Sequence, residues 1–461
     1  MIHLLSKVTR GFIVAVFGLM FGDEGKGKAI LDLIIRDGFT VNIRWQGGGN
    51  AGHSLSLGNG RTFVTHLIPS GCVLPGILLL LGNDMVGDPT KLKDEILGVE
   101  KFTGHSILNR LFISRNFSLT TPYHRVFDRA NEWLAKNPIG TTGSGIGTTY
   151  GDKALRKGLR MGQIMNKGKF DDLFLEFIHF QQSMLKAYIA LGFEINEDEQ
   201  TKINQELKEW IKSIDWIREN LTIVDMQEKV EELLAKGEKI LAEGAQGIML
   251  DINEGDYPFV TSSMTGPAGL FSGLGCGPKD VKKYYGIMKP YVTKVGGGDF
   301  PSQMVKWHED LFQVEGNEKG ATTGRKRMCG YPDMVLLRHA INMFANFGKL
   351  HIIMTKCDCY PSELVNEPMF MITHYLYDGD NKATKHLRFP LSDVKDTIKV
   401  QVECWKVPFG TTVWSHQIGM DLFIRQMRDE LHDLETEDLY TIEMIGTGPQ
   451  VTQHYEYAFP S

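Results

Sequence analysis

The sequence predicts an α/β fold, in which a large, mostly parallel, twisted sheet carries helices on both faces and helical insertions. Three observations support this prediction. Short runs of β-branched and aromatic residues recur along the chain, glycine-rich loops follow them, and the first such loop leads into an amphipathic helix. Ligands are then expected where the loops gather, at the carboxyl ends of the strands.

The first strand is predicted over residues 12–19, "FIVAVFGL", because its apolar residues do not alternate with polar ones, as in a strand buried on both faces. A helix is predicted to follow from about Lys28 to Arg36. Later strands are predicted at 39–46 and 76–86, before the loops "EGAQG" (243–247) and "TKCD" (355–358), and at the start of "LYTIEMIGTGP" (439–449).

The polar stretch 195–240 has apolar residues three to four positions apart and is predicted to be a helical insertion. Residues 421–432 have the pattern of a late amphipathic helix. Because no internal repeat or Pro/Ser linker interrupts the chain, residues 1–461 are predicted to form a single domain.

Composition narrows the function class. The net charge of −6 gives no indication of a nucleic-acid-binding surface. The six cysteines show no Cys-x-x-Cys spacing, which predicts reduced thiols in the cytoplasm rather than disulfides or a zinc site. The apolar run 11–22 follows Lys7 and Arg10 as in a secretory signal, but it is too short to span a bilayer and an acidic loop follows at once, so no membrane association is expected.

Residues 22–28, "GDEGKGK", have the spacing of a P-loop-like phosphate site. Glycine amides and a helix N-terminus bind phosphate oxygens, and Lys26 and Lys28 can neutralise their charge. Ala29 stands where a P-loop carries the Ser or Thr that binds magnesium. Asp23 could supply a metal ligand instead, or act as a general base. An ordinary acidic turn before a helix is the alternative.

Two further loops carry polar side chains suited to catalysis or ligand binding, and the second of them implies a small acidic substrate. "QGGGNAGHS" (46–54) combines glycines, an amide and His53, which is either a proton donor or a structural histidine. "GATTGRKR" (320–327) ends in three cations, and Arg325 and Arg327 can bind carboxylate or phosphate in bidentate fashion. A solvated basic turn is the alternative interpretation of this loop.

"TKCD" has the Lys-x-Asp pattern of guanine recognition after a strand. The Asp358 carboxylate can accept hydrogen bonds from N1–H and from the exocyclic amine of guanine, while the stem of Lys356 packs on the ring. The tripeptide also arises by chance, and the phosphate loop in the same chain is what favours the guanine interpretation. The loops 140–153 and 243–247 add hydroxyls, amides and Gln246, each of which alone is unspecific.

Together these motifs resemble the adenylosuccinate synthetase family, in the family's order, from about Gly11 to about Pro449. The motifs are "GDEGKGK", "QGGGNAGHS", "GTTGSGIG…YGDK", "EGAQGIMLDINEGDYPFVTSS", "GATTGRKR", "TKCD" and "GTGP". The resemblance implies a ligase of purine biosynthesis that joins L-aspartate to IMP, with GTP as phosphoryl donor and one Mg²⁺ per active site. It also implies a cytoplasmic homodimer.

The resemblance implies the following site residues. The catalytic residues are Asp23, which removes the N1 proton of IMP and contacts magnesium, His53, which acts as an acid near the transferred phosphoryl group, Lys26 and Gln246. IMP and aspartate contacts fall on Asn50, Thr142, Arg156, Gln246, Thr261, Thr322, Thr323, Arg325 and Arg327, with Arg156 reaching the IMP of the neighbouring subunit. GTP contacts fall on Gly22, Glu24, Gly25, Lys26, Gly27, Lys28, Gly52, His53, Ser54, Arg327, Lys356, Asp358, Gly446, Thr447 and Gly448. The magnesium ligands are Asp23 and the carbonyl of Gly52.

Several positions depart from the family's pattern near the purine and amino-acid pockets. Ser144 stands where most members have an arginine that binds aspartate. The other departures are Met264, Gly266-Pro267, Met328-Cys329, Tyr331-Pro332, Gly446 and the stretch 404–420. They leave two alternatives open: a related ligase that acts on dGMP to give 2-aminoadenylosuccinate, and a GTP-binding switch protein.

Overall fold

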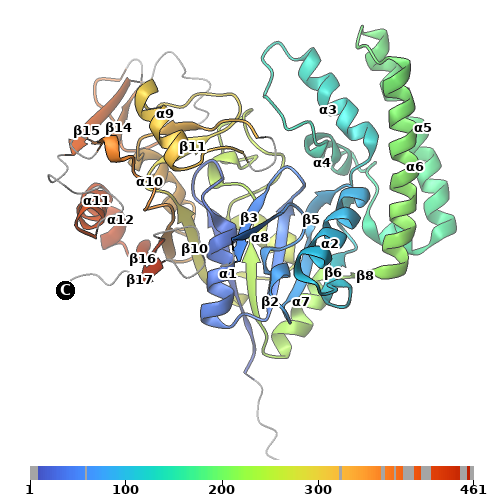
Figure 1. The fold of residues 1–461 in the computed structure, drawn as a ribbon, viewed down its shortest axis with the longest axis horizontal. Coiled ribbons are helices and arrows are strands. Elements are labelled where there is room, and N and C mark those ends of the chain that lie inside the picture. The colour runs from blue at the N-terminus through green and yellow to red at the C-terminus, as the bar shows by residue number, and fades with distance from the viewer. Residues whose placement is uncertain are drawn as a thin grey trace, which may run out of the picture.

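The computed structural model describes residues 9–57, 60–320, 324–364, 369–377, 380–387, 399–405, 417–446 and 454–456. The strands of its main sheet are β1 (Phe12–Gly18), β2 (Val41–Gly47), β5 (Leu78–Gly87), β6 (Leu111–Ser114), β7 (Ser118–Leu119), β8 (Thr222–Val224), β9 (Lys239–Glu243), β10 (Val281–Met288), β13 (Leu350–Met354), β16 (Tyr440–Gly446) and β17 (His454–Glu456). Their order is β17-β16-β13-β10-β1-β9-β2-β5-β6-β8, with β7 paired to β5 (Figure 1). Only β16 and β17 pair antiparallel in the described part of this sheet, so the predicted large, mostly parallel sheet is confirmed.

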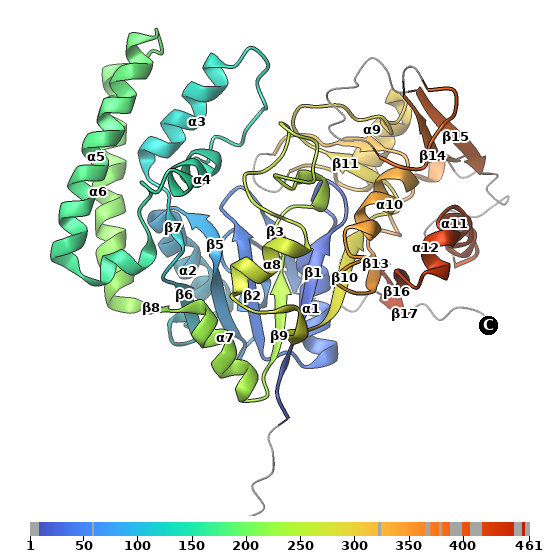
Figure 2. The ribbon, with the colours of Figure 1, turned by 180° about the vertical axis from the view of Figure 1, so that it is seen from behind.

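Helices cover both faces of the sheet, as the two opposite views show (Figures 1 and 2). On one face lie α1 (Lys26–Asp37) and α2 (Pro89–Thr103), and on the other lie α7 (Met226–Ala235), α8 (Pro267–Leu274) and α10 (Met334–Asn342). The central strand β1 is buried on both sides. Ile13, Ala15 and Phe17 join the core cluster of α7, α8 and α10, whereas Val14 and Val16 join that of α1 and α2. A continuous apolar run is what such a strand requires.

The first strand and helix follow the prediction closely. β1 ends at Gly18, one residue before the predicted end, and α1 begins at Lys26 rather than Lys28. The earlier start has a local cause, because Gly25 is the N-cap in a left-handed conformation (φ +83°), which only glycine adopts readily. Both lysines of the loop therefore lie within the first helical turn.

The stretch 195–240 is more varied than predicted. It contains α6 (Glu197–Asn220) and α7, but β8 lies between them and pairs with β6 at the edge of the sheet. This three-residue strand, Thr-Ile-Val, is too short to show a pattern in the sequence. A second long helix, α5 (Lys167–Ala190), lies beside α6 outside that edge (Figures 1 and 2). The stacked rings of Phe174 and Trp210, 5.3 Å apart, join the two helices. The single-domain organisation stays a prediction.

Smaller elements surround the carboxyl edge of the sheet. These are α3 (Pro122–Leu134), α4 (Ile146–Ala154), α9 (Lys306–Glu315), and the antiparallel pairs β3 (His53–Leu57) with β4 (Arg61–Thr65), β11 (Val292–Lys294) with β12 (Met328–Gly330), and β14 (Met369–Leu376) with β15 (Lys399–Trp405). The late helix predicted at 421–432 corresponds to α11 (Gln417–Glu430) and the start of α12 (His432–Thr436). Within the described ranges, no helix is both long and apolar enough to cross a bilayer.

Parallel strands bring the predicted motifs together. β1, β2, β9 and β13 all end at the same edge, and the loops 22–28, 47–54, 244–247 and 355–358 follow them in that order. Because each loop comes shortly after the end of its strand, four motifs that are far apart in sequence become neighbours at one edge. β16 also ends at this edge with Gly446, and the rest of the predicted motif 446–449 lies outside the described residues.

Candidate active site

A cavity of about 1320 Å³ lies over the carboxyl edge of the sheet. The predicted residues that line it are Gly22, Asp23, Glu24, Gly25, Lys26, Gly27, Lys28, Asn50, Gly52, His53, Ser54, Thr142, Gln246, Thr261, Arg325, Arg327, Lys356 and Asp358. Arg156 and Gly446 are not among its lining residues. Thr322, Thr323, Thr447, Gly448 and most of the stretch 404–420 lie outside the described residues.

The phosphate loop is held in shape by Glu24, which is 1% exposed. Its carboxylate accepts hydrogen bonds from the backbone amides of Met20 (3.1 Å) and Gly22 (2.7 Å) and pairs with the Lys26 ammonium at 2.8 Å. Gly18 leaves room for this arrangement, since a Cβ there would lie 2.5 Å from the Glu24 carboxylate and 2.7 Å from the Lys26 nitrogen. The acid inside the loop therefore fixes the loop amides and one lysine before any ligand binds.

Asp23 has a different environment. Its backbone is left-handed (φ +61°), a conformation that Asp and Asn tolerate better than most residues. The Oδ2 atom accepts a hydrogen bond from Arg327 Nε at 2.8 Å, and the side chain is 28% exposed. The arginine fixes one carboxylate oxygen, so that Oδ1 is the oxygen that remains for a substrate proton or a metal ion.

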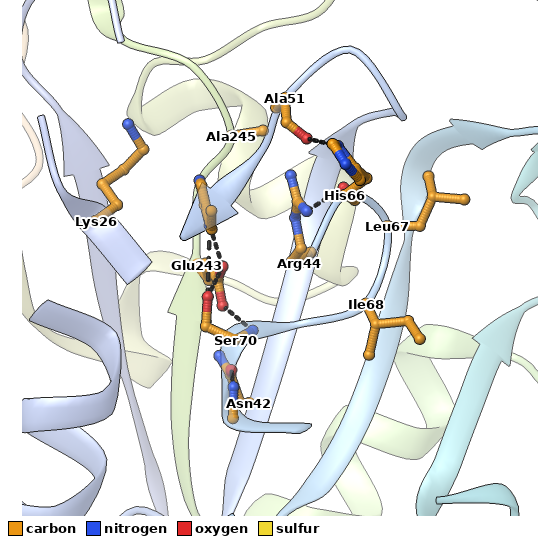
Figure 3. A network of polar contacts seen from close by, with 12 residues as sticks. Lys26, Asn42, Arg44, Ala51, His66, Leu67, Ile68, Ser70, Glu243 and Ala245 are labelled. Carbon is orange, nitrogen blue, oxygen red and sulfur yellow. Dashed lines mark hydrogen bonds and ion pairs between the residues drawn. The ribbon is translucent and has the colours of Figure 1, made fainter. Parts of the chain in front are cut away.

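His53 belongs to a buried polar network behind the loop. Its Nδ1 contacts the carboxylate of Glu243, the last residue of β9. Glu243 also accepts hydrogen bonds from the Ser70 amide (2.8 Å) and hydroxyl (2.7 Å) (Figure 3). Burial would raise the pKa of Glu243, but the hydrogen bond and charge of His53 outweigh it and hold this pKa at about 2. Burial lowers the pKa of His53. His53 therefore donates Nδ1–H to the Glu243 carboxylate, and Nε2 remains for a ligand.

Strand β2 supplies a polar stripe to the same network. Asn42, Arg44 and Gln46 occupy alternate positions along the strand and are 0% exposed, so they share one face of the sheet. Figure 3 shows Asn42 and Arg44 on this strand. The Asn42 side chain bridges the Leu241 carbonyl and the Gly71 amide, at 3.0 and 2.7 Å. The Arg44 guanidinium donates to the His66 carbonyl, and its charge favours the ionised form of Glu243. β2 thus places polar side chains and a positive charge beside the pair of Glu243 and His53.

Unpaired polar atoms occur in the cavity wall next to this network. Gln246 is left-handed (φ +57°), and its Nε2 donates to Asn50 Oδ1 at 3.1 Å. The Oε1 of Gln246 and the Oγ1 of Thr261 are buried and have no partner within the described structure. Buried polar atoms are rarely left unsatisfied without a functional reason. An acceptor and a hydroxyl at this point are suited to the polar edge of a planar ligand.

The loop after α3 is held by two acids that the sequence prediction did not include. Glu132 accepts hydrogen bonds from the amides of Ile139 (3.1 Å) and Gly140 (2.8 Å), and Asp128 accepts one from Gly145 at 3.0 Å. The Arg325 guanidinium donates to the Gly140 carbonyl at 3.1 Å. The arginine loop and the loop 139–145 therefore meet across the cavity.

Comparison with known proteins decides the family. The model of the adenylosuccinate synthetase family matches residues 15–455. The chain belongs to the adenylosuccinate synthetase family. It is 34% identical to the adenylosuccinate synthetase of Parabacteroides distasonis, over 95% of this chain and 97% of that relative. It is 39% identical to that of Chlorobium phaeobacteroides, over 81% and 82%. The chain is accordingly an enzyme of the ligase class, and the predicted recognition and enzyme class are confirmed.

Solved structures agree with this assignment. The fully ligated adenylosuccinate synthetase of Plasmodium falciparum superposes with a TM-score of 0.82 at 28% identity, covering 97% of this chain and all of that one. The succinoaminodeoxyadenylate synthetase of cyanophage S-2L reaches a TM-score of 0.61 at 16% identity, covering 97% and 95%. The second likeness shows a shared fold alone.

The donor set of this synthetase fits magnesium that binds together with a nucleotide. Asp23 and the Gly52 backbone line the same cavity, and the described residues include no cluster of three acids, histidines or cysteines. Magnesium commonly takes one or two protein ligands and completes its shell with substrate phosphates and water. The hard oxygens of Asp23 and Gly52 beside a phosphate loop match that pattern.

Two residues central to the geometry were missed from the sequence. Glu243 opens the "EGAQG" loop, where only the glutamine was singled out, and Glu318 lies just before "GATTGRKR". Glu318 binds Lys356, whose ammonium lies 2.7 Å from its carboxylate and 2.8 Å from the Gly316 carbonyl. A signal was present in both cases: an acid at the end of a strand or beside a cluster of cations is a candidate for pairing.

Proposed function

We propose that this chain ligates L-aspartate to IMP with GTP, through a 6-phosphoryl-IMP intermediate, and releases adenylosuccinate, GDP and phosphate. The observation that carries the proposal is the convergence on one cavity of a carboxylate with a free oxygen (Asp23), a phosphate loop (22–28), a guanine-type carboxylate (Asp358) and an arginine (Arg325). Each group suits a different part of this three-substrate reaction.

In the first step Asp23 takes the proton from N1 of IMP. The electron pair of that N–H bond shifts onto the 6-oxygen, which attacks the γ-phosphorus of GTP. The bond between O6 and phosphorus forms as the bond to the β,γ-bridging oxygen breaks, and GDP leaves. Loop amides and Lys26 stabilise the transferred group where its charge develops. Magnesium, when bound by Asp23, Gly52 and the nucleotide, would supply further positive charge there.

His53 lies at the phosphoryl end of the same path. Its role as an acid requires a proton on Nε2 while phosphate is bound. Negative phosphate oxygens favour the charged imidazole, and Glu243 on Nδ1 is placed to stabilise it.

In the second step the amine of aspartate attacks C6 and phosphate leaves with the former 6-oxygen. Arg325 and Arg327 are assigned to the substrate carboxylates, which guanidinium groups bind in bidentate fashion. Asn50, Gln246 and Thr261 are assigned to IMP because all three line the cavity, and Gln246 and Thr261 each have a buried polar atom without a partner among the described residues.

The proposal is tested by phosphate release with GTP and combinations of nucleotide and amino acid. Release is expected only when IMP and aspartate are both present. Turnover with dGMP but not IMP would establish the related ligase instead. Hydrolysis that ignores both IMP and aspartate would indicate a GTP-binding switch.

Asp358→Asn is expected to change the preferred base. An amide cannot accept hydrogen bonds from both N1–H and the exocyclic amine of guanine, so one donor loses its partner. Loss of a charged hydrogen bond in a buried polar site typically costs 10²-fold or more in kcat/KM, and we expect about that loss for GTP. Xanthosine triphosphate carries an oxygen in place of the amine, so it should be used better by the variant than by the wild type. Measured kcat/KM values for both nucleotides check this, and an unchanged GTP preference would refute the role of Asp358.

We also propose a homodimer in which Arg156 enters the neighbouring site. Arg156 is exposed and lies outside its own cavity. Residues close to Arg156 in the chain contact the middle of α5. The Lys157 ammonium lies 3.8 Å from the ring centre of Phe180, and Asp152 accepts a hydrogen bond from Gln181 at 2.7 Å. The same region exposes large apolar side chains: Leu155, Leu173, Leu175, Met184, Ile189 and Leu191. Exposed apolar side chains in such number mark a contact surface.

Mixing two inactive variants tests this arrangement. Arg156→Ala and Asp23→Asn each disable the site to which they contribute. If Arg156 acts in the neighbouring subunit, a mixed dimer has one intact site, and random mixing should restore about a quarter of wild-type activity. Activity that stays at the level of the separate variants would contradict the shared site. The cytoplasmic location stays a prediction from the cysteine pattern.

A further inference from the structure

Glu318 is a buried acid near the cavity that accepts hydrogen bonds from four side chains. It is 0% exposed and precedes the arginine loop. One carboxylate oxygen, Oε1, accepts from Lys356 at 2.7 Å, from the Tyr291 hydroxyl at 2.6 Å and from Lys289 at 3.1 Å. The other, Oε2, accepts from Arg327 Nη1. Four donors from three separate segments of the chain thus converge on one side chain.

Two of these donors belong to different substrate sites. Arg327 uses its Nε for Asp23 at 2.8 Å and its Nη1 for Glu318, so the two acids fix the plane of the guanidinium. Lys356 has a left-handed backbone (φ +53°) and lies two residues before Asp358 in the guanine motif. Both cations line the cavity, whereas Glu318 does not.

The charge balance favours ligands that carry negative charge. Three cations, Lys289, Lys356 and Arg327, face two carboxylates, Glu318 and Asp23, which leaves one net positive charge. Burial lowers the pKa of Lys289 to about 8, while the charge of Glu318 opposes this, so its ammonium form prevails at pH 7. Burial would raise the pKa of Glu318, but the three cations outweigh burial and lower it.

We infer that Glu318 is a positioning residue that holds Arg327 and Lys356 as one unit and so shapes the aspartate and GTP sites together. The inference rests on the proposed function for the identity of the two substrates. A single rigid acceptor orders both cations before the substrates arrive, which removes part of the entropy cost of binding each. The IMP contacts assigned above, Asn50, Gln246 and Thr261, have no hydrogen bond to Glu318 among the described residues.

Glu318→Gln tests the inference, because glutamine keeps the shape of the side chain but cannot accept from four donors. We expect the KM values for aspartate and for GTP each to rise about tenfold, with the KM for IMP changing less than twofold. Glu309→Gln is the matched control: Glu309 is also buried, at 4% exposure, and its Oε1 accepts from the Cys329 amide at 3.1 Å. It does not line the cavity, so all three KM values should stay near those of the wild type.

The outcomes separate the possibilities. If KM for aspartate and GTP stay as in Glu309→Gln, or if KM for IMP rises equally, the inference is overturned. If Glu318→Gln does not fold, Tyr291→Phe removes only one donor, and a two- to threefold rise in the same two KM values is expected; no rise would overturn the inference. Wild-type protein that fails to ligate IMP would refute the proposed function instead. In that case the dissociation constant of GTP, measured by equilibrium dialysis for wild type and Glu318→Gln, would still test whether Glu318 shapes the GTP site.

Discussion

Asp23→Asn is expected to lower kcat by about 10³-fold or more. The amide keeps an oxygen for Arg327 and tolerates the left-handed backbone, so the loop should retain its shape. It cannot take a proton from N1 of IMP, and general-base catalysis alone contributes about 10²–10⁴-fold. The loss of one anionic magnesium ligand adds to this. Steady-state phosphate release with saturating IMP, GTP and aspartate measures the effect.

Asp37→Asn, at the other end of α1, is the control for removal of an acid near the same helix. Asp37 pairs with Arg36 at 2.7 Å and does not line the cavity, so its loss should leave kcat unchanged. Thermal unfolding of both variants should match the wild type, because the Asp23 side chain is partly exposed. Near-normal turnover of Asp23→Asn would remove the assigned base from the mechanism.

Glu243→Ala is expected to lower the free energy of unfolding by about 3–5 kcal/mol. The substitution leaves Arg44 buried without the Glu243 charge that favours its ionised form, and it removes the acceptor of His53 and Ser70. Denaturant unfolding at pH 7 measures the loss. Glu206→Ala, which breaks a half-exposed ion pair with Arg125, should cause only a small fraction of that change.

The effect of Glu243 should depend on pH in a defined direction. Its pKa is about 2 in the folded protein against 4.5 for a free side chain, a difference equivalent to about 3 kcal/mol. A depressed carboxyl pKa stabilises the fold fully above about pH 4.5 and progressively less as the pH falls toward 2. The difference in the free energy of unfolding between wild type and Glu243→Ala should therefore decrease over that range. A difference that is constant from pH 7 to pH 3 would contradict an ionised, paired Glu243.

The sequence predicted the parts of the fold that depend on local pattern. β1 and α1 were placed within two residues because an apolar run, a glycine loop and an amphipathic helix follow one another. Eighteen of the predicted site residues line one cavity. Most of them follow the parallel strands β1, β2, β9 and β13, so their convergence is a property of the topology. Thr142, Arg325 and Arg327 follow helices instead, and it was the resemblance to the family that assigned them to the site.

What the sequence could not show is the pairing between distant residues. Glu243 meets His53 across 190 positions, and Glu318 meets Lys356 across 38. Such contacts depend on strand order, which no local pattern specifies. β8 was missed because three residues carry too little signal. The ion pair of Lys356 with Glu318 was not anticipated either, while the packing of the Lys356 stem on guanine stays a prediction.

The fate of oxygen-18 placed at position 6 of IMP tests the central claim most directly. If the Asp23 carboxylate makes the 6-oxygen a nucleophile toward GTP, the label leaves C6 attached to phosphorus. Mass spectrometry of the released phosphate should then show one oxygen-18 atom per phosphate, in the presence of aspartate. Released phosphate that contains only GTP-derived and solvent oxygens would contradict the account, because it would mean that IMP never captured the phosphoryl group.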